Sequence, residues 1–258
     1  MNILIGDIGN TVTKICIVNK NYKIKKIIFF NSNNIVSRKF LNQKFNKDLK
    51  TTHFNKTALF SSVVPKYSIL FKKFLKKKYK IVFKDIKDKR INKIVNINIK
   101  NRSQVGSDRI ANAVGVFKKY RTNCIVLDFG TATTFDVITK NGIYNGGIIA
   151  PGVNLAIKSL SHSADQIPMF SLKRQTKIIG KNTIEALRAG FYWGYSGLIN
   201  NIIFKIEKET KKKYKIIFTG GYANLFKSSI KRPFKVNKNI TIDGIIEIYK
   251  KNMKYLSK

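Results

Sequence analysis

Two short segments of this sequence, one in each half, carry residues suited to binding phosphate groups. The first contains Asp7-Ile8-Gly9-Asn10-Thr11 and the second contains Asp128-Phe129-Gly130-Thr131. Each follows an apolar run, has the form Asp-x-Gly, and leads through small polar residues into a second apolar run. Successive backbone N–H groups at such a turn can surround an anion, and glycine lets the anion approach the main chain. We therefore treat both turns as candidate phosphate loops.

The aspartate of each turn adds a second kind of chemistry. A carboxylate at a strand end can hold Mg²⁺, directly or through water, or a monovalent cation. A transferring phosphoryl group needs donors and metal together, because its charge is spread over several oxygens. One Asp-x-Gly alone is most often an ordinary hairpin turn. Two copies, with Asp7 and Asp128 lying 121 positions apart, instead predict two similar halves that face one another across a cleft.

A third candidate is the segment Gly106-Ser107-Asp108-Arg109. Apolar residues follow it at Ile110, Ala113, Val114 and Phe117, which is the spacing of one helix face. The pattern predicts a helix over 108–120 with Ser107 as its N-cap and Asp108 in its first turn. The helix dipole then favours the carboxylate form of Asp108. The Asp-Arg pair is either an ordinary cap with solvent-facing charges or part of an active site.

The remaining elements position these candidates. Gly9-Asn10 between two apolar runs indicates a hairpin, because both residues tolerate positive φ, and the returning strand is predicted from Thr11 to Val18. Residues 216–221 read as a strand that ends in the pair Gly220-Gly221, which admits a flat ring or a sugar against the backbone. By itself, a glycine pair after a strand is most often just a turn.

A long helix is predicted over residues 183–206, beginning with Thr183. Its glycines Gly190, Gly194 and Gly197 suggest close approach of another helix or a kink. No low-complexity linker separates the halves. We therefore place the domain boundary inside the helix at 108–120, which gives lobes of residues 1–114 and 115–258.

Composition limits the class of protein. The 258 residues are 43% hydrophobic, and no apolar stretch approaches the roughly 20 residues of a membrane helix. No signal peptide is evident, so we expect a cytoplasmic protein without membrane attachment. Cys16 and Cys124 lie in apolar runs typical of core residues in a reducing compartment. His53 and His162 have no companions at metal-ligand spacing.

The formal charge of +38 raises the question of nucleic-acid binding. Lysine far outnumbers arginine and is scattered along the chain together with abundant isoleucine and asparagine, all of which have AT-rich codons. Genomic base composition is a sufficient explanation for much of this excess. Lysine runs such as 76–78 and 211–213 are therefore interpreted as solvated faces, and we do not expect specific nucleic-acid recognition. A positive field could still accelerate the arrival of anionic substrates.

Taken in order, these segments resemble the acetate kinase/hexokinase/heat-shock-70/actin superfamily, and specifically the type III pantothenate kinase family. The resemblance covers nearly the whole chain, and Gly-x-Asp-Arg and the start of the 183–206 helix are its most specific parts. It implies two ribonuclease-H-like lobes, the actin-like ATPase fold, with a central cleft. The matching segments are residues 7–11, 61–65, 105–109, 128–134, 146–152, 179–183, 190–195 and 219–221.

The resemblance also implies an activity, which is ATP-dependent phosphorylation of pantothenate, the first step toward coenzyme A. The residues that it implies for ATP are Asp7, Ile8, Gly9, Asn10, Thr11, Val12, Thr13, Lys14, Thr131, Gly220 and Gly221. Those implied for pantothenate are Gly106, Ser107, Asp108, Arg109 and Thr183, with Asp108 taking the proton of the substrate hydroxyl. Mg²⁺ is expected with ATP, a monovalent cation (K⁺ or NH₄⁺) at Asp128, and a homodimer with pantothenate near the subunit interface.

One departure concerns the substrate. Family members commonly carry tyrosine seven residues before the glycine of Gly-x-Asp-Arg, whereas this sequence has Ile99 there. Two other functions stay open at this level. One is a regulatory or nucleic-acid-binding protein on the same fold without turnover, and the other is a kinase of another alcohol.

Overall fold

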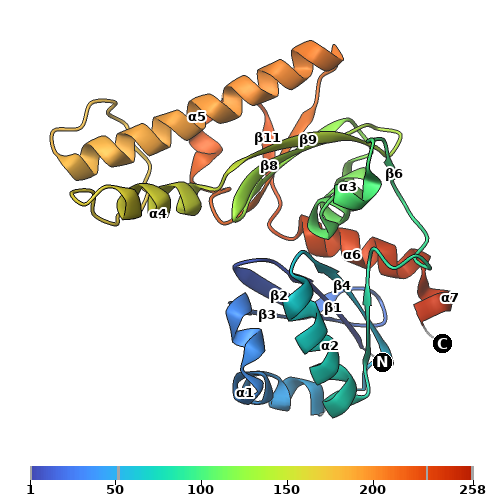
Figure 1. Cartoon of the computed structure of the whole chain (residues 1–258). Coiled ribbons are helices and arrows are strands. Elements are labelled where there is room, and N and C mark those ends of the chain that lie inside the picture. The colour runs from blue at the N-terminus through green and yellow to red at the C-terminus, as the bar shows by residue number, and fades with distance from the viewer. Residues whose placement is uncertain (1, 51–52, 231, 257–258) are drawn as a thin grey trace. The chain divides into compact units, whose positions relative to one another are not determined.

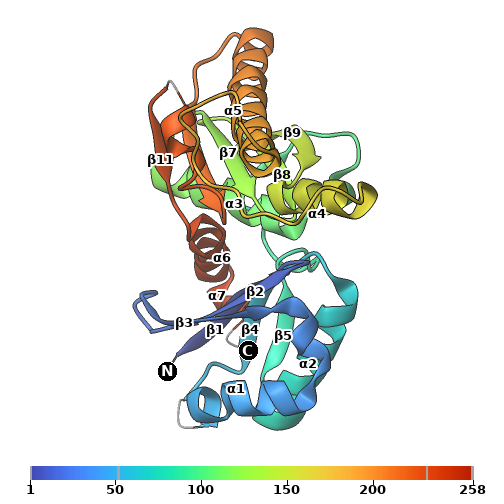
Figure 2. The same ribbon diagram turned by 90° about the vertical axis from the view of Figure 1, so that its left-hand side faces the viewer.

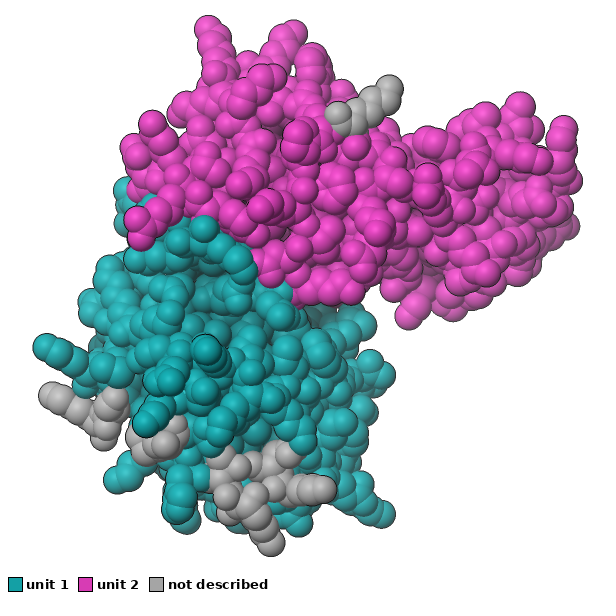
Figure 3. All heavy atoms as spheres, turned by 180° about the vertical axis from the view of Figure 1, so that it is seen from behind, with its two compact units in different colours: residues 1–119, 239–258 teal, residues 120–238 magenta. Residues whose placement is uncertain are grey.

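The structure is a computed structural model that describes residues 2–50, 53–230 and 232–256. The chain forms two compact units, coloured separately in Figure 3. Unit 1 comprises Met1–Lys119 and Asn239–Lys258, and unit 2 comprises Tyr120–Lys238. The division differs from the predicted one, because the last twenty residues group with the first unit and the helix predicted at 108–120 stays with it almost entirely.

The sheet of unit 1 has the strand order β3-β2-β1-β4-β5 (Figures 1 and 2). Strands β1, β2 and β3 form an antiparallel meander, and β4 and β5 run parallel to β1. Parallel neighbours need crossover connections, which α1 and α2 supply. The elements are β1 (Ile3–Ile8), β2 (Val12–Val18), β3 (Ile24–Asn31), α1 (Arg38–Lys50), β4 (Thr57–Ser62), α2 (Pro65–Tyr79) and β5 (Val82–Asp85).

The two faces of this sheet are covered by different helices. Helices α1 and α2 cover one face over an aromatic cluster that includes Phe45, Phe60 and Phe71, which are fully buried. On the other face, α6 (Ile240–Lys251) packs against β1 and β4 and also contacts α3 (Ser107–Tyr120). A Cβ atom at Gly244 would lie 1.8 Å from the carbonyl oxygen of Ala111. Backbone contact this close explains why the C-terminal helix belongs to unit 1.

Unit 2 repeats the same design. Its strands follow the order β11-β10-β7-β8-β9, with β7, β8 and β9 antiparallel and β10 and β11 parallel to β7. Each of the five strands in the sheet of unit 1 thus has a counterpart in unit 2, and the internal duplication predicted from the two turns is present in the fold. The strands are β7 (Cys124–Phe129), β8 (Ala132–Ile138), β9 (Ile143–Pro151), β10 (Lys215–Gly220) and β11 (Phe234–Val236).

Two helices pack on this second sheet. They are α4 (Val153–Ser163) and α5 (Thr183–Thr210), and α5 buries Tyr192, Ile199 and Ile203 in the core of the unit. The α5 helix is continuous for 28 residues. A Cβ atom at Gly190, Gly194 or Gly197 would meet nothing within 4 Å. Within the described chain no other segment approaches these glycines, which face open space, and the helix continues through them without interruption.

Short elements complete the structure. They are β6 (Asn96–Ile97), the 3₁₀ turns η1 (Ser32–Val36), η2 (Arg102–Gln104) and η3 (Phe226–Ser229), and the terminal helix α7 (Met253–Leu256). None of the helices in the described ranges is long and apolar enough to cross a membrane.

Candidate active site

The first phosphate loop connects β1 to β2. The N–H of Gly9 donates to the carbonyl of Val12, with 3.2 Å between N and O. The hairpin predicted here is confirmed, because β1 and β2 pair antiparallel on either side of the turn, although Gly9 and Asn10 are not among the described residues with positive φ. The glycine is required for a different reason. A Cβ atom at Gly9 would lie 2.9 Å from the carbonyl oxygen of Val12, which is closer than real Cβ atoms come.

Ser32, at the start of η1, forms hydrogen bonds with this loop. Its Oγ donates to the carbonyl of Gly9 at 2.6 Å and lies 2.8 Å from Oγ1 of Thr13. Its N–H donates to the carbonyl of Thr11 at 2.9 Å. Ser32 and Thr13 are both fully buried. Sequence reasoning missed Ser32, although its place directly after β3, whose Asn31 pairs with Val12, was an available indication.

The predicted ATP residues of this loop divide into two groups. Asn10, Thr11 and Val12 are exposed and can meet a ligand. Ile8 and Thr13 are fully buried, so their side chains shape the loop. Any contact that they make with ATP has to come from the main chain.

Lys14, Asp7 and Ser61 stand side by side on three neighbouring strands. Asp7 of β1 lies opposite Lys14 of β2 and opposite Ser61 of β4. Paired residues project from the same face of a sheet, so the three side chains form a row across it. This is the face that α6 covers, and Nζ of Lys14 donates to Oδ1 of Asn239, the N-cap residue of α6, at 3.3 Å.

The segment around Asp108 begins α3 on the same side of unit 1. The helix starts at Ser107, and the carbonyl of Gly106 accepts from the N–H of Ile110 at 3.1 Å, so Gly106 takes the N-cap place. The prediction that Ser107 caps the helix is wrong. Its hydroxyl instead donates to the carbonyl of Ser62 at 2.7 Å and accepts from Oγ of Ser61 at 3.2 Å.

Asp108 is held against the first turn of α3. Its Oδ1 accepts the N–H of Arg109 at 2.8 Å, and a Cβ atom at Gly106 would lie 2.4 Å from that oxygen. The absence of a side chain at Gly106 therefore makes room for the carboxylate. Burial raises the pKa of Asp108 above its ordinary value, against the lowering effects of the Arg109 N–H, the Arg109 charge and, more weakly, Lys87.

Lys87 secures the loop that leads into α3. Its Nζ donates to the carbonyl of Ser103 at 2.8 Å and to the carbonyl of Val105 at 3.1 Å. A cation thus stands beside the turn that carries Asp108. Sequence reasoning missed this residue too, because a single lysine among so many carries no distinguishing pattern.

In unit 2, the second phosphate loop and the glycine pair come together. Thr219 and Gly220 lie beside Asp128 and Phe129 in the pairing of β10 with β7. Gly220 has φ of 83°, and a Cβ atom there would lie 2.7 Å from Oδ1 of Asp128 and 2.6 Å from the backbone of Phe129. Gly221 donates its N–H to the carbonyl of Phe129 at 3.0 Å. Only glycine fits at position 220.

The start of α4 belongs to the same cluster. A Cβ atom at Gly152 would lie 2.1 Å from the carbonyl oxygen of Thr131, which places the end of β9 directly against the second loop. The hydroxyl of Tyr222 donates to Oδ1 of Asn154, so the residue after the glycine pair is joined to α4. Asn154 and Tyr222 are further candidates that sequence reasoning did not select.

Thr183 is the first residue of α5 and is exposed. The preceding Asn182 caps the helix, because its Oδ1 accepts the N–H of Glu185 at 2.9 Å. The carboxylate of Glu185 in turn accepts the N–H of Lys181, the residue before the cap, also at 2.9 Å. Gly180 is required here, since a Cβ atom would lie 2.2 Å from the nitrogen of Ala186.

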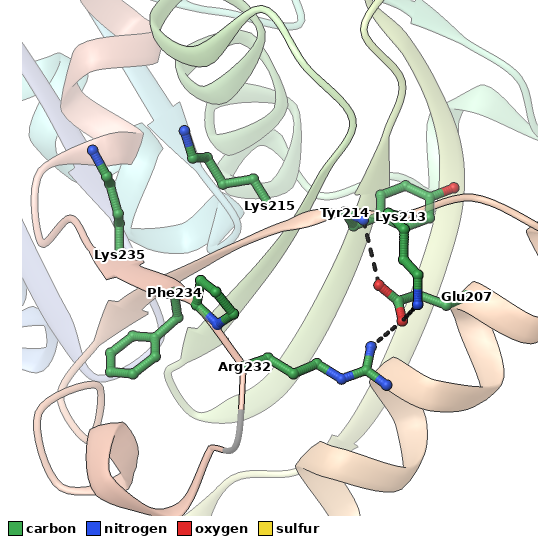
Figure 4. A pocket seen from close by; sticks show the side chains of 8 residues that line it. Glu207, Lys213, Tyr214, Lys215, Arg232, Phe234 and Lys235 are labelled. Atoms are coloured by element: carbon green, nitrogen blue, oxygen red, sulfur yellow. Dashed lines mark hydrogen bonds and ion pairs between the residues drawn. The ribbon is translucent and has the colours of Figure 1, made fainter.

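Two other features lie away from these residues. Cys16 and Cys124 are free thiols, and burial raises the pKa of each to about 12, so they are unreactive core residues. A hollow of about 460 Å³ in unit 2 is lined by Glu207 and by residues 213–215 and 232–235 (Figure 4). There Glu207 pairs with Arg232 and Lys213, and none of the predicted site residues lines it.

Two units of the same strand order, each with an Asp-x-Gly loop between its first two strands, define the actin-like ATPase class of folds. Solved structures of this fold agree. A conserved Campylobacter jejuni protein named as a Baf family transcriptional activator has a TM-score of 0.63 at 21% identity, covering 98% of this chain and 100% of its own. The activator of 2-hydroxyisocaproyl-CoA dehydratase from Clostridium difficile, solved with bound ADPNP, has a TM-score of 0.55 at 11% identity, covering 99% and 98%.

The sequence comparisons specify the family. The family model described as type III pantothenate kinase matches residues 3–205. A type III pantothenate kinase of Pelagibacter ubique is 50% identical over 250 residues, which cover 95% of this chain and 97% of the relative. One from Citrifermentans bemidjiense is 38% identical over 197 residues, covering 76% and 77%. The chain belongs to the type III pantothenate kinase family, and its activity is the ATP-dependent phosphorylation of pantothenate that begins coenzyme A synthesis.

Proposed function

We propose that Asp108 is the proton acceptor of this kinase and that the two Asp-x-Gly loops hold the phosphates of ATP. One observation supports this assignment above the others. The start of α3, which carries Asp108, is hydrogen-bonded through Ser107 to the end of β4, and Ser61 of that strand lies opposite Asp7. The carboxylate and the first phosphate loop therefore belong to one rigid part of unit 1.

The reaction requires this kind of arrangement. The primary hydroxyl of pantothenate attacks the γ-phosphorus, its O–H bond breaks, and the bond from that phosphorus to the β–γ bridging oxygen breaks to release ADP. The proton passes to Asp108. Phosphoryl transfer depends more on alignment than on a strong base, and a carboxylate at a helix start provides a fixed acceptor. Burial, which raises the pKa of Asp108, also makes it a better acceptor than an exposed carboxylate.

In this proposal the two loops stabilise the negative charge of the phosphate groups. The exposed Asn10 and Thr11 in unit 1, and the exposed Thr131 in unit 2, offer donors to the phosphate oxygens. Lys14 adds a positive charge beside Asp7. Gly220 and Gly221 leave the backbone next to Asp128 bare, which suits the flat parts of a nucleoside.

The expected cations fit the available donors. Asp7 is the second-last residue of β1, beside the loop, and is only half-buried, so it can meet a Mg²⁺ ion through water. Asp128 has carboxylate oxygens near the carbonyl-rich turn of the second loop, and hard oxygen donors suit K⁺ or NH₄⁺. When bound with ATP, Mg²⁺ would neutralise charge on the phosphates. Among the described residues no group of three or more His, Cys, Asp or Glu side chains could hold a metal ion.

We assign the substrate carboxylate of pantothenate to Arg109 and one of its polar groups to Thr183. Arg109 follows Asp108 in the sequence, and its guanidinium can form two parallel hydrogen bonds with a carboxylate. Thr183 is exposed at a helix start where backbone N–H groups favour anions. With Ile99 in place of the common tyrosine, we expect weaker binding of pantothenate rather than slower transfer.

We further propose that the active unit is a cytoplasmic homodimer that uses the exposed face of α5. Along this face Gly190, Gly194 and Gly197 recur at helical spacing, and Trp193 stands among them with 37% of its surface exposed. Small residues allow another helix to approach closely, and an exposed tryptophan is a common interface anchor. The two buried free thiols agree with a reducing compartment.

Release of ADP, measured with and without pantothenate and first in K⁺ and then in Na⁺ buffer, tests this function. We expect release that depends on pantothenate and is faster in K⁺. Equal release without pantothenate would exclude the kinase assignment, and release with another alcohol of a test panel would change the substrate. Equal rates in K⁺ and Na⁺ would contradict the proposal that Asp128 binds a monovalent cation.

A further inference from the structure

A short chain of hydrogen bonds inside unit 1 joins the strand beside Asp7 to the start of α3. Oγ of Ser61 donates to Oγ of Ser107 at 3.2 Å, and Oγ of Ser107 donates to the carbonyl of Ser62 at 2.7 Å. Ser61 is fully buried and Ser107 is 1% exposed, so water does not compete for these bonds. Buried hydroxyls in such a chain are costly unless each is satisfied, as they are here.

The acceptor at the end of this chain is itself fixed to the first phosphate strand. Ser62 lies opposite Ile8 in the pairing of β4 with β1. One residue later, the N–H of Val63 donates to the carbonyl of Ile8 at 3.2 Å. The hydroxyls of Ser61 and Ser107 and the carbonyl of Ser62 therefore fix the position of the first turn of α3 relative to the strand that carries Asp7.

The geometry points to Ser61 as a positioning residue for phosphoryl transfer, which acts by fixing Ser107 and thereby the direction in which Asp108 projects. This inference rests on the proposed role of Asp108. Because Ser61 is buried, it cannot touch a substrate and has to act through its neighbour. Displacement of a reacting group by about 1 Å can cost about a hundredfold in rate, so a single hydroxyl that sets an orientation has a measurable effect.

Steady-state kinetics of Ser61→Ala test the inference. We expect kcat to fall by about tenfold or more, while KM for ATP changes by less than about twofold, because the phosphate loop keeps its own contacts through Ser32. Ser61→Cys, which keeps the volume but is a weak donor, should give the same loss and covers the case in which the alanine variant folds poorly. A kcat within twofold of the unmodified enzyme for a folded variant would overturn the inference.

Ser68→Ala is the matched control. Ser68 lies in α2, and its Oγ donates to Oγ of Ser62 at the same strand end and to the carbonyl of Val64. It should lower the melting temperature as Ser61→Ala does and leave kcat unchanged. Equal losses of kcat in both variants would reduce Ser61 to a general stabilising role and would contradict the inference.

A double-mutant cycle with Ser107→Ala decides whether Ser61 acts through Ser107. If it does, the double variant should be no slower than Ser107→Ala alone, whereas multiplied losses would show independent roles and contradict the inference. The acid limb of the kcat profile should also move to lower pH in Ser61→Ala, because a loosened Asp108 becomes better solvated. An unmodified enzyme that releases no ADP with pantothenate would refute the proposed function; an active one with unaffected Ser61 variants would refute only this inference.

Discussion

Oδ1 of Asp108 lies 2.8 Å from the backbone nitrogen of Arg109 and accepts its hydrogen bond. This bond turns the carboxylate back onto the first turn of its own helix. The space that it occupies exists because Gly106 has no side chain. The Gly-x-Asp-Arg motif is therefore a steric unit, in which the glycine makes room for the aspartate and the residue between them anchors the turn to β4.

Asp108→Asn should separate activity from stability. We expect a loss of about a hundredfold or more in kcat, because an amide cannot accept the proton of the hydroxyl. Burial raises the pKa of folded Asp108 above that of the unfolded chain, so ionisation costs stability as the pH rises through this window. At neutral pH the amide avoids that cost, and the melting temperature should stay equal or rise. Turnover close to the original rate would exclude Asp108 as proton acceptor.

Lys87→Met should shift the pH dependence of turnover. The charge of Lys87 lowers the pKa of Asp108, so its removal should raise that pKa further. Since the acceptor must be ionised, the acid limb of kcat should move to higher pH. Lys89→Met removes the same charge from an exposed side chain two positions away and serves as control. A shift of equal size in both variants would reflect general charge instead of a specific contact.

Ser32→Ala should weaken ATP binding. It leaves the carbonyl of Gly9 and the hydroxyl of Thr13 without the bonds described above, at a cost of about 1–3 kcal/mol in unfolding free energy. The loosened loop should raise KM for ATP more than it lowers kcat. The control is Ser37→Ala, which removes an exposed bond to the N–H of Phe40 at the start of α1. Urea unfolding and ATP titration of both variants check this, and an unchanged KM in Ser32→Ala would count against the role of the loop.

Adjacent glycines of unit 2 should behave differently. Gly220→Ala forces a side chain into positive φ and against the backbone of Phe129, and it should cost about 1–3 kcal/mol in stability. A Cβ atom at Gly221 would lie 3.9 Å from the carbonyl oxygen of Phe129, which is ordinary contact. Gly221→Ala should therefore keep the melting temperature and, if the nucleoside lies there, raise KM for ATP. Equal melting temperatures for both variants would contradict this geometry.

Gly194→Leu tests the proposed dimer. A Cβ atom at this position meets nothing within 4 Å in the isolated chain, so the folded protomer should tolerate leucine. A second copy packed on this face of α5 would not, and light scattering after gel filtration should show a dimer converted to monomer. Lys208→Ala, at the exposed end of the same helix, should leave the dimer intact. A variant that stays dimeric would place the interface elsewhere.

The sequence alone determined the duplicated design, because each Asp-x-Gly turn joins two short apolar runs that pair as neighbouring antiparallel strands. It also indicated Asp108, since a glycine, an aspartate and an apolar helical face are adjacent in the chain. It predicted the hairpin at Gly9 correctly but not why glycine is needed there, which is close contact with the carbonyl of Val12 and not a positive φ.

Only the tertiary structure decided the partners that lie far apart in sequence. Ser32 and Gly9, Ser61 and Ser107, and Gly244 and Ala111 meet because strand pairing and helix packing bring distant segments within bonding distance. The residue type of a serine or a glycine does not by itself indicate such a contact. The return of the C-terminal helix to the first unit has the same origin, since close backbone approach depends on where two helices cross and not on either helix alone.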